Sequence, residues 1–354
     1  MPNSKVLIGM SGGVDSSVAA FLMKKAGYDC FGVTMALCEG LPDCPAFHCE
    51  DAMNVAAKMN IPFSVFQASS LFREKVVDVF VENYERGLTP NPCIECNKNI
   101  KFSAMVDYGI SIGCDYVVTG HYAIIRQDVA TGRYLLYKAK DENKDQSYFL
   151  ACLNQYQLAH TILPLGELTK EDVRKIAEEQ GFVTAHKRDS QDICFIPDGD
   201  FAGFIQKYTG NSFIHGDYLD INGKIVGKHD GAIRYTLGQR KGLHLALGEP
   251  VYVCHKNMDT NTVTVGPDCA LYHKELTANN WNWVSIPSLV KPMKVQAKIR
   301  YRHIPQTATV YPNEDGTASV VFEQPQRAIT PGQAVVLYQD RLVVGSGTIQ
   351  SFSK

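Results

Sequence analysis

The chain has 354 residues, enough for two or three domains of about 100–200 residues each. Its 45% hydrophobic and 20% charged residues are typical of a globular protein with a buried core. The net charge of −2 excludes binding of nucleic acid through the charge of the whole molecule, so any RNA site has to be a local basic patch. No run approaches about 18 consecutive apolar residues, which excludes a transmembrane helix and argues against a membrane partner.

The start of the chain and its cysteines bear on the cellular compartment. The first apolar run is too short for a signal peptide, so we expect a cytoplasmic protein whose thiols stay reduced. The 11 cysteines are an odd number in a long chain, which argues against a disulfide scaffold. We therefore expect some of them to serve catalysis or metal binding.

The first 200 or so residues alternate between strand and helix patterns. Strands are predicted at residues 5–10, 30–35, 63–66 and 116–119. Helices are predicted at residues 15–26, 50–59 and 71–84. Strands that alternate with helices predict an α/β domain with a doubly wound parallel sheet.

The pattern changes twice after this region. From about Phe201, short runs separated by glycine turns predict a small mixed domain, and from about Leu276 nearly every run is strand-like. Asp315-Gly316 and Gln339-Asp340 stand where hairpin turns belong, which favours a small β-barrel. The predicted domains are a catalytic domain at 1–200, a middle domain at 201–274 and a C-terminal β-barrel at 275–354.

A glycine-rich string, GMSGGVDSS at residues 9–17, lies between the first predicted strand and helix. Adjacent glycines let backbone N–H groups form an anion nest, and the helix N-terminus adds partial positive charge. Ser11 and Ser16 add hydroxyl donors, and Asp15 is placed to hold a magnesium ion that bridges phosphates. The string lacks the Gly-Lys-Ser/Thr ending of a Walker A loop. The alternative is an ordinary glycine turn with a helix cap.

The string SGGVDSS resembles the PP-loop of ATP pyrophosphatases, which cleave ATP between the α- and β-phosphates and pass AMP to a substrate oxygen. That motif alone leaves several members open, among them GMP synthetase, NAD synthetase, argininosuccinate synthetase, tRNA lysidine synthetase and the tRNA thiolases.

Five further sequence motifs narrow the choice among these PP-loop enzymes. They are TPNPCIECNKNIKF at 89–102, TGHY at 119–122, NKDQSYFL at 143–150, DSQDICFI at 189–196 and YTLGQRKGL at 235–243. In this order, and followed by PGQ at 331–333, they resemble the tRNA-specific 2-thiouridylase family of bacteria and mitochondria. The resemblance covers essentially the whole chain. It implies an enzyme that adenylates O2 of the wobble uridine with ATP, releases pyrophosphate, and transfers persulfide sulfur to C2, giving 2-thiouridine and AMP.

The resemblance assigns different tasks to two cysteines. Cys194 takes the position that carries the persulfide, and Cys96 takes the nucleophile position that accepts a disulfide or releases hydrogen sulfide. Either task requires a thiolate, so a lowered pKa is expected. For any single cysteine the alternative is a buried small hydrophobic residue. That alternative suits Cys30, Cys114, Cys152 and Cys254.

Cys93 departs from the family pattern, in which an aspartate stands three residues before the first catalytic cysteine. Cys93, Cys96 and Cys194 together supply three thiolates, which resembles the [4Fe-4S] arrangement of other tRNA thiolases. A zinc site, a redox disulfide and a bystander substitution are the alternatives. We favour the metal-free persulfide mechanism because most of the motif matches that family.

A second group of cysteines is formed by Cys38, Cys44 and Cys49, together with His48. Its irregular spacing makes a zinc knot a weak hypothesis, and a mobile loop is the preferred alternative.

The resemblance also implies binding residues. ATP and magnesium are expected at Gly9, Met10, Ser11, Gly12, Gly13, Val14, Asp15 and Ser16, with Met35 near adenine and Gly120 near the nucleotide. Contacts to tRNA are expected from Asn91, Pro92, Cys93, His121, Lys144, Asp145, Gln146, Arg300, Tyr301 and Gln333. A cysteine desulfurase or a sulfur-relay protein has to supply the sulfur.

Charge favours an RNA surface on the last domain. Residues 275–354 hold 8 Lys or Arg and 5 Asp or Glu, a net charge of 8 − 5 = +3. In a continuous strand, Lys294, Lys298, Arg300 and Arg302 would share one face. The alternative is a solvated barrel face. Residues 239–241 provide a second candidate patch.

Two rival functions agree less well with the sequence than the thiolase does. An enzyme that adenylates a small metabolite has no use for the two cysteine strings. A cysteine-rich iron–sulfur or zinc protein that only binds RNA has no use for an intact phosphate loop.

Overall fold

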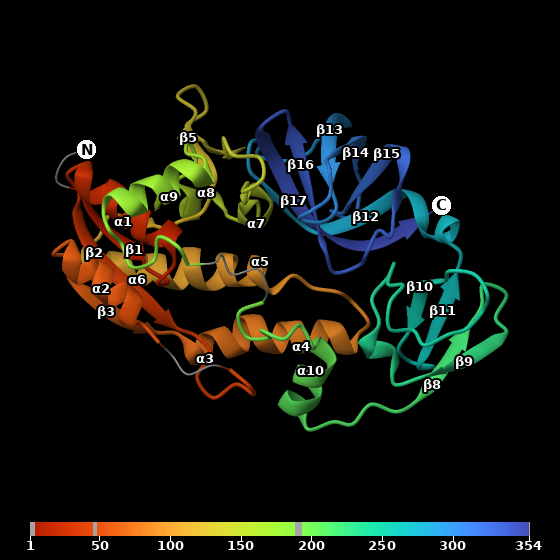
Figure 1. Ribbon diagram of the computed structural model, residues 1–354. Helices are drawn as coiled ribbons and strands as arrows, with labels where there is room; N and C mark the ends of the chain where they lie inside the picture. The colour runs from red at the N-terminus through yellow and green to blue at the C-terminus, as the bar shows by residue number, and fades with distance from the viewer. Residues whose placement is uncertain (1–3, 45–47, 188–192, 354) are drawn as a thin grey trace.

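The computed structural model describes residues 4–44, 48–187 and 193–353. Its N-terminal part contains a five-stranded sheet in which all neighbouring strands are parallel (Figure 1). In spatial order the strands are β3 (Phe63–Gln67), β2 (Asp29–Ala36), β1 (Lys5–Gly9), β4 (Tyr116–Val118) and β7 (Thr161–Ile162). The predicted parallel sheet is confirmed.

Helices cover both faces of this sheet. Successive residues of a strand point to opposite faces, so Val6 and Ile8 of β1 face one helical layer and Leu7 faces the other. The first layer consists of α1 (Val14–Lys25), α2 (Glu50–Lys58) and α9 (Lys170–Glu179). The second layer includes α6 (Met105–Ser111), which packs against Leu7. This arrangement confirms the doubly wound fold.

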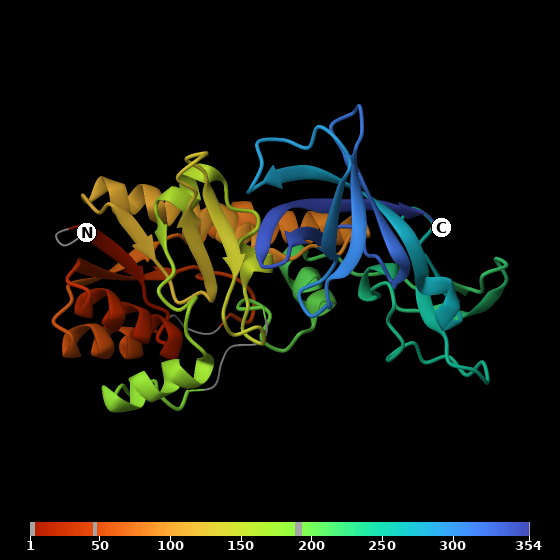
Figure 2. The ribbon, with the colours of Figure 1, turned by 90° about the horizontal axis from the view of Figure 1, so that it is seen from above.

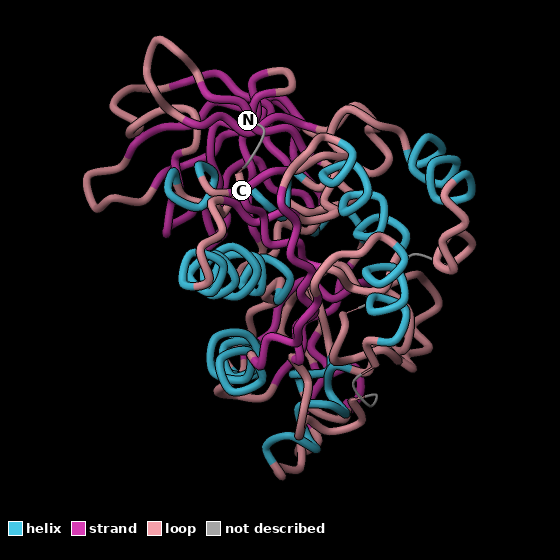
Figure 3. The backbone as a smooth tube through the Cα atoms, turned by 90° about the vertical axis from the view of Figure 1, so that its left-hand side faces the viewer, coloured by secondary structure: helices cyan, strands magenta, loops and turns pink. Residues whose placement is uncertain are grey.

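Two long helical rods run side by side from the sheet toward the rest of the molecule, and Figure 3 views them almost end-on. The first rod is formed by α3 (Ser69–Phe72), a π-helical segment (Arg73–Val77) and α4 (Asp78–Glu85). The second rod is formed by α5 (Pro92–Cys96), a π-helical segment (Asn97–Ala104) and α6. The second rod was not predicted from the sequence. Its start carries an N-cap, because the side chain of Asn91 accepts a hydrogen bond from the Cys93 amide.

The C-terminal part is a closed barrel, as predicted. Its strands, in spatial order, are β12 (Tyr272–Trp283), β15 (Ala318–Arg327), β14 (Gln306–Pro312), β13 (Met293–Lys298), β16 (Ala334–Gln339) and β17 (Leu342–Ser353). Pairing of β12 with β17 closes the barrel. The turn at Asp315-Gly316 joins β14 to β15, and Asp340 lies in the turn between β16 and β17, so both predicted hairpins are present.

A hairpin from the N-terminal half of the chain extends the barrel sheet. It consists of β5 (Ala123–Gln127) and β6 (Tyr134–Lys138), and Tyr137 pairs with Leu342 of β17. Two short helices, α7 (Ser147–Leu150) and α8 (Gln155–Ala159), follow it. Residues 123–138 therefore join the first and last parts of the molecule. We keep the division of the chain at residues 200 and 274 as a proposal.

The middle part contains a helix and a small sheet, seen beside the barrel in Figure 2. The helix, α10 (Phe201–Thr209), packs its Phe204 and Ile205 into the same cluster as α4. The sheet has the order β10 (Tyr252–Asn257), β11 (Thr262–Gly266), β8 (Gly216–Leu219) and β9 (Ile225–His229). This mixture of helix and strand agrees with the predicted fold class.

One prediction about the barrel is wrong. Strand β13 ends at Lys298, so Arg300 and Arg302 do not continue its alternation of faces. The Arg300 guanidinium instead donates a hydrogen bond to the carbonyl oxygen of Ala328. The expectation that these four side chains share one face is wrong, because side chains alternate between faces only within a continuous strand.

Among the described residues, no helix is long and apolar enough to cross a membrane.

Candidate active site

The phosphate loop lies at the carboxyl end of β1, between two parallel neighbours. The Ser11 amide donates to Ser16 Oγ at 3.2 Å, and Ser16 Oγ donates to the Gly13 carbonyl oxygen at 3.1 Å. Gly12 has a φ of +71°, a left-handed conformation that favours glycine. These contacts fix the loop in an ordered turn before α1, at the edge of the sheet where open α/β folds bind their ligands.

Gly120 lies against this loop. It follows β4, and a Cβ atom at this position would lie 2.7 Å from the Ser16 amide nitrogen and 2.8 Å from the Asp15 carbonyl carbon. Only glycine permits so close an approach of two backbones. The structure thus places Gly120 beside the predicted nucleotide loop, while its contact with ATP stays a prediction.

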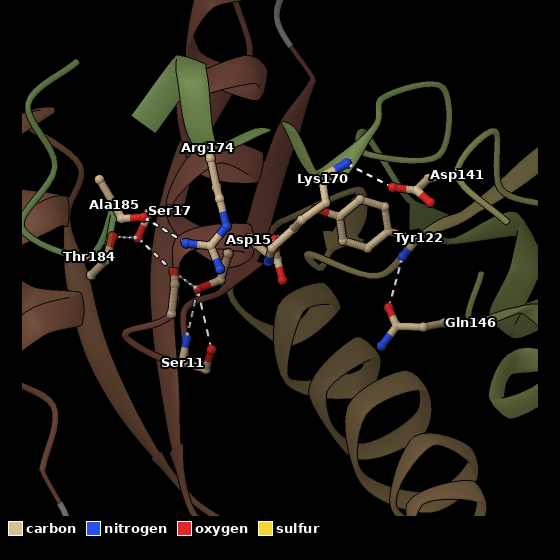
Figure 4. Close-up of polar contacts among 12 residues, drawn as sticks. Ser11, Asp15, Ser17, Tyr122, Asp141, Gln146, Lys170, Arg174, Thr184 and Ala185 are labelled. Carbon is tan, nitrogen blue, oxygen red and sulfur yellow. Dashed lines mark hydrogen bonds and ion pairs between the residues drawn. The ribbon is translucent and has the colours of Figure 1, made fainter. Parts of the chain in front are cut away.

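Asp15 is held by two residues that the sequence analysis missed (Figure 4). Its Oδ1 accepts hydrogen bonds from Lys170 Nζ at 2.7 Å and from the Tyr122 hydroxyl at 2.8 Å. Lys170 is buried in the first turn of α9, which Thr169 caps. A capping box was visible in the sequence, but nothing local indicated that Lys170 would reach the phosphate loop.

The residues around Asp15 fit a magnesium ion that is bound together with nucleotide. Magnesium usually takes one or two carboxylates, substrate phosphates and several waters, rather than a complete protein cage. Among the described residues, no group of three or more His, Cys, Asp or Glu side chains is arranged to hold a metal ion. Asp15 would supply the protein ligand, and the phosphates would supply most of the rest.

The fold brings together cysteines that are distant in the sequence. Cys96 is buried in a hydrophobic cluster that also contains Ile193 and Phe195, the two neighbours of Cys194. Cys93 and Cys194 are exposed. The first four residues of the motif around Cys194, at 189–192, lie outside the described residues.

The three thiols differ strongly in acidity. A hydrogen bond from the Cys38 thiol, the largest cause, together with the charge of Lys101, lowers the pKa of Cys194 to about 7. Burial raises the pKa of Cys96 to about 12, although Lys101 opposes that shift. Loss of water around its sulfur also raises the pKa of Cys93, although the residue as a whole is exposed, and Lys101 again opposes the shift. The expected lowering of the pKa is therefore found at Cys194, whereas the expectation is wrong for Cys96 because burial raises its pKa.

Lys101 is a second residue that the sequence analysis missed. It lies on the π-helical segment that follows α5, close enough for its charge to act on all three thiols. The signal that was available is its position in the string NKNIKF, five residues after Cys96. In a regular helix that spacing does not place two side chains on one face, so it was not recognised.

The three cysteines do not fit an iron–sulfur cluster in this arrangement. Cys93, Cys96 and Cys194 are all described, and no group of three ligand-type side chains in the described chain is placed to hold a metal. The same finding applies to Cys38, Cys44, Cys49 and His48. We therefore derive no chemical step through a cluster or a zinc ion.

The cysteines of the second group have different surroundings. Cys38 and Cys44 pack against the cluster that contains Cys96 and Phe195. Cys49 lies apart from them, and its thiol contacts the Met53 sulfur at 3.5 Å. The described part of this segment is a loop of turns, as the preferred alternative expected, and its mobility stays a prediction.

Comparison with known proteins is decisive at this point. The chain matches three families in succession: "tRNA methyl transferase HUP domain" at residues 4–198, "tRNA methyl transferase PRC-barrel domain" at 202–267 and "Aminomethyltransferase beta-barrel domain" at 273–349. The tRNA-specific 2-thiouridylase MnmA of Clostridioides difficile is 48% identical, with 98% of each chain covered. That of Acetivibrio thermocellus is 46% identical, with 99% of this chain and 100% of the relative covered. The chain belongs to the tRNA-specific 2-thiouridylase family.

Solved structures give only a weak match. The "U34-tRNA thiolase NcsA from Methanococcus maripaludis with its [4Fe-4S] cluster" is 18% identical, with a TM-score of 0.35, and the match covers 59% of this chain and 72% of that one. A likeness this distant carries no argument about the cofactors of this 2-thiouridylase.

Several residues that were expected to contact tRNA in this 2-thiouridylase have structural partners. His121 Nδ1 is 2.8 Å from the Thr119 hydroxyl, and burial lowers its pKa well below the usual value, which leaves the ring neutral. Gln146 Oε1 accepts a hydrogen bond from the Tyr122 amide at 2.9 Å. Asp145 is buried, and its carboxylate accepts hydrogen bonds from the Ala139 amide and from Ser147. Their tRNA contacts stay predictions.

Two of the expected residues of the last domain pack near the segment around α5. The Gln333 side chain donates a hydrogen bond of 2.6 Å to the carbonyl oxygen of Thr89, just before the cap of α5. Tyr301 packs its ring against Phe149, with centroids 4.3 Å apart. The barrel of the enzyme therefore supports the loop that leads to its cysteine helix.

Three further expected residues, Met35, Pro92 and Lys144, lie in different parts of the N-terminal domain. Met35 is partly buried and packs in the core against Phe66, so its role near adenine stays a prediction. Pro92 is buried in the first turn of α5, where its missing amide proton is not needed. Lys144 lies in the turn between β6 and α7, and its amide donates to the Asp141 carbonyl oxygen.

Proposed function

We propose that this chain is an ATP-dependent tRNA-uridine 2-sulfurtransferase that makes 2-thiouridine at the anticodon wobble position. One observation supports it most. In a chain that matches 2-thiouridylases along its whole length, both neighbours of Cys194 pack in the cluster that contains Cys96, and the pKa of Cys194 is lowered to about 7. A location of this cluster near the phosphate loop is supported by strand order, because β1 and β2 are parallel neighbours and Cys38, which packs on the cluster, follows β2.

In the first step ATP activates the base. The oxygen at C2 of uridine is a poor leaving group, and its attack on the α-phosphate of ATP releases pyrophosphate and leaves the oxygen attached to AMP. The phosphate loop would bind the nucleotide through its backbone N–H groups and serine hydroxyls. Magnesium, when bound, neutralises phosphate charge. Lys170 holds the Asp15 carboxylate in place and adds a cation beside the loop.

In the second step sulfur replaces the adenylated oxygen. The Cys194 thiolate accepts sulfane sulfur from a cysteine desulfurase or a relay protein. Its persulfide then either attacks C2 itself or is cleaved to sulfide, which attacks C2, and AMP leaves with the former uridine oxygen in both cases. A partner thiol forms a disulfide with Cys194, and a cellular dithiol has to reduce that disulfide before the next turnover.

Binding of tRNA would engage residues from all three parts of the chain. The exposed position of Cys93 and Cys194 is compatible with access of a base that has been turned out of the anticodon loop. Exposed cations on the barrel, including Lys294 and Arg302, are candidates for phosphate contacts. The expected contacts of Asn91, Arg300 and Tyr301 belong to this proposal.

The proposal is tested by separating the two steps. Cys194→Ser should abolish 2-thiouridine formation while pyrophosphate release with unmodified tRNA continues, because oxygen cannot carry sulfane sulfur. Asp15→Ala should instead abolish pyrophosphate release, because magnesium loses a ligand and Lys170 loses its partner. Accumulation of adenylated tRNA by Asp15→Ala would contradict the assignment of the phosphate loop. Pyrophosphate release with a small metabolite in place of tRNA would favour the rival adenylating enzyme.

A further inference from the structure

Lys187 is a further lysine whose side chain contacts the phosphate loop. Its Nζ donates hydrogen bonds to the Gly12 carbonyl oxygen at 3.2 Å and to Asp51 Oδ2 at 2.8 Å. Asp51 lies in the first turn of α2, and a Cβ atom on Gly12 would lie 3.2 Å from the Cβ of Asp51. The phosphate loop, the start of α2 and Lys187 are therefore in direct contact.

The backbone that carries Lys187 is fixed against α1. The Lys187 amide donates to the Thr184 carbonyl oxygen at 3.0 Å. The buried Thr184 hydroxyl donates to the hydroxyl of Ser17, in the first turn of α1, at 3.2 Å (Figure 4). Arg174 of α9 donates to the Ala185 carbonyl oxygen at 3.3 Å. These contacts hold the segment beside the phosphate loop.

The same segment is anchored at its other end. Phe182 is buried, and its ring meets the ring of Phe21 from α1 with centroids 6.3 Å apart. Lys58, the last residue of α2, donates to the Gly181 carbonyl oxygen at 2.7 Å. Lys58 therefore holds the segment through its backbone, which makes it a matched control for Lys187.

Lys170 and Lys187 differ in how firmly they are held beside the loop. The Lys170 side chain is 11% exposed and is paired with Asp15. The side chains of Lys187 and Asp51 are 52% and 46% exposed. An ion pair between exposed side chains contributes little to stability, because water and salt screen it. Lys187 can therefore exchange Asp51 for another anion at low cost, whereas Lys170 is committed to Asp15.

The terminal phosphates of a nucleoside triphosphate are such an anion. A glycine-rich loop and the N-terminus of the helix that follows it bind phosphate groups through their amides. Lys187 reaches this loop at Gly12, two residues before α1 begins at Val14. A lysine on a flexible stem supplies a point charge that suits phosphate oxygens. Its exposure leaves it able to turn toward them.

We infer that Lys187 binds the pyrophosphate part of ATP, and that Asp51 holds this lysine until the nucleotide arrives. The inference rests on the proposed function, because it requires the loop to bind ATP for adenylation. Lys187 leaves Asp51 when the β- and γ-phosphates enter. As the bond between the α-phosphate and the bridging oxygen breaks, its electron pair leaves with pyrophosphate, and Lys187 stabilises the charge that accumulates there. Lys187 stays protonated throughout.

Binding of ATP and of AMP to the full-length protein tests this assignment. In calorimetric titrations, Lys187→Gln should weaken ATP binding at least about tenfold and change AMP affinity by less than about twofold, because AMP lacks the β- and γ-phosphates. Lys187→Arg keeps the charge and should retain most of the ATP affinity. The control Lys58→Gln removes a lysine that anchors the same segment and should bind both nucleotides as the unaltered protein does.

A double-mutant cycle tests the exchange with Asp51. Asp51→Asn should tighten ATP binding, partly because Lys187 is released from its ion pair. The gain should therefore be smaller when Lys187→Gln is also present. Equal gains in both backgrounds would contradict the exchange.

Three further outcomes bear on the inference. Unchanged ATP affinity in Lys187→Gln, or a loss of AMP affinity as large as the loss of ATP affinity, would overturn it and leave the proposed function standing. Equal losses of ATP affinity in Lys58→Gln and Lys187→Gln would show that Lys187 only holds the segment, which also overturns it. Failure of the unaltered protein to bind ATP would overturn both the inference and the proposed function.

Discussion

At the residue scale, Lys101 is a cation whose charge reaches Cys93, Cys96 and Cys194 together. Each thiol becomes negatively charged when it ionises, so a fixed positive charge nearby favours ionisation of all three. For Cys194 the hydrogen bond from Cys38 is the larger cause and Lys101 the smaller. The thiolate that accepts sulfur therefore depends on two residues from separate segments.

Lys101→Gln should raise the pKa of Cys194 by less than about one unit, because the larger contribution from Cys38 remains. Alkylation of Cys194 by iodoacetamide, followed by mass spectrometry, measures this pKa. Since the thiolate is the reactive form and its pKa is about 7, the rate in the unaltered protein should fall as the pH drops below about 7. Lys98→Gln removes an exposed charge from the same helical segment and should not change the pH dependence of the alkylation rate. If the pH dependence of alkylation is the same in Lys101→Gln as in the unaltered protein, the charge of Lys101 does not act on Cys194.

Gly120→Ala should weaken ATP binding at least about tenfold, a loss of about 1.4 kcal/mol. The added Cβ would lie 2.7 Å from the Ser16 amide nitrogen, so either the phosphate loop or the 119–121 segment has to move. Calorimetric titration with ATP measures the effect. Gly109→Ala on α6 is the control, since its Cβ would meet Leu7 at an ordinary 3.4 Å. Unchanged ATP affinity in Gly120→Ala would show that this close approach does not shape the nucleotide site.

At the element scale, a turn of the barrel clamps the loop before the cysteine helix. The Thr89 amide donates to the Pro331 carbonyl oxygen at 3.0 Å, and the Gln333 side chain donates to the Thr89 carbonyl oxygen. Gly332 has a φ of +90°, and a Cβ there would lie 2.8 Å from the Thr89 amide nitrogen. The string PGQ therefore holds the chain at Thr89 in place, whatever it also contacts in tRNA.

Gln333→Ala should cost about 0.5–1.5 kcal/mol of stability through its lost hydrogen bond. It should also speed amide hydrogen exchange at the cap of α5, because the Thr89 carbonyl oxygen loses its barrel partner. Hydrogen exchange, measured by mass spectrometry on peptides that span residues 88–96, should show this faster exchange. Gln296→Ala changes an exposed glutamine of β13 and should not alter these peptides. Equal exchange in both variants would contradict the clamp.

Much of the fold followed from sequence, because periodicity and turn residues are local signals. Strand β1, helix α1 and the hairpin turn at Asp315-Gly316 are examples. The helix that begins at Pro92 was not predicted, because its many polar residues make the pattern of the buried Ile100 and Phe102 hard to recognise in the sequence. At the site, the phosphate loop could be predicted because its residues are consecutive in the sequence. The approach of Lys170, Tyr122 and Cys38 depends on tertiary packing, which no local pattern encodes.

At the scale of the whole molecule, the near-neutral net charge makes the distribution of exposed cations decisive for RNA binding. Two of the expected barrel cations are partly withdrawn from solvent. Lys298 lies over the rings of Tyr148 and Tyr301, and Arg300 is bound to backbone carbonyls. Lys294 and Arg302 are exposed. The exposed pair is therefore the better candidate for phosphate contacts.

Neutralising Lys294 and Arg302 together by glutamine should weaken tRNA binding and reduce its salt dependence by roughly two units of slope, about one per phosphate contact. Filter binding across a range of salt concentrations measures the slope, and ATP affinity should stay unchanged. Lys25→Gln with Lys75→Gln removes the same charge from exposed positions elsewhere and should leave the slope intact. Equal slopes for both double variants would place the RNA surface away from this side of the barrel.

The central claim is that adenylation and sulfur transfer are coupled at one site on one tRNA. A single-turnover experiment tests it most directly: protein preloaded with persulfide on Cys194 is mixed with ATP and unmodified tRNA, with no further sulfur source, and all products are counted. We expect equal amounts of pyrophosphate, AMP and 2-thiouridine, up to the amount of loaded Cys194, and no 2-thiouridine when ATP is omitted. Formation of 2-thiouridine without a matching amount of AMP and pyrophosphate would contradict it.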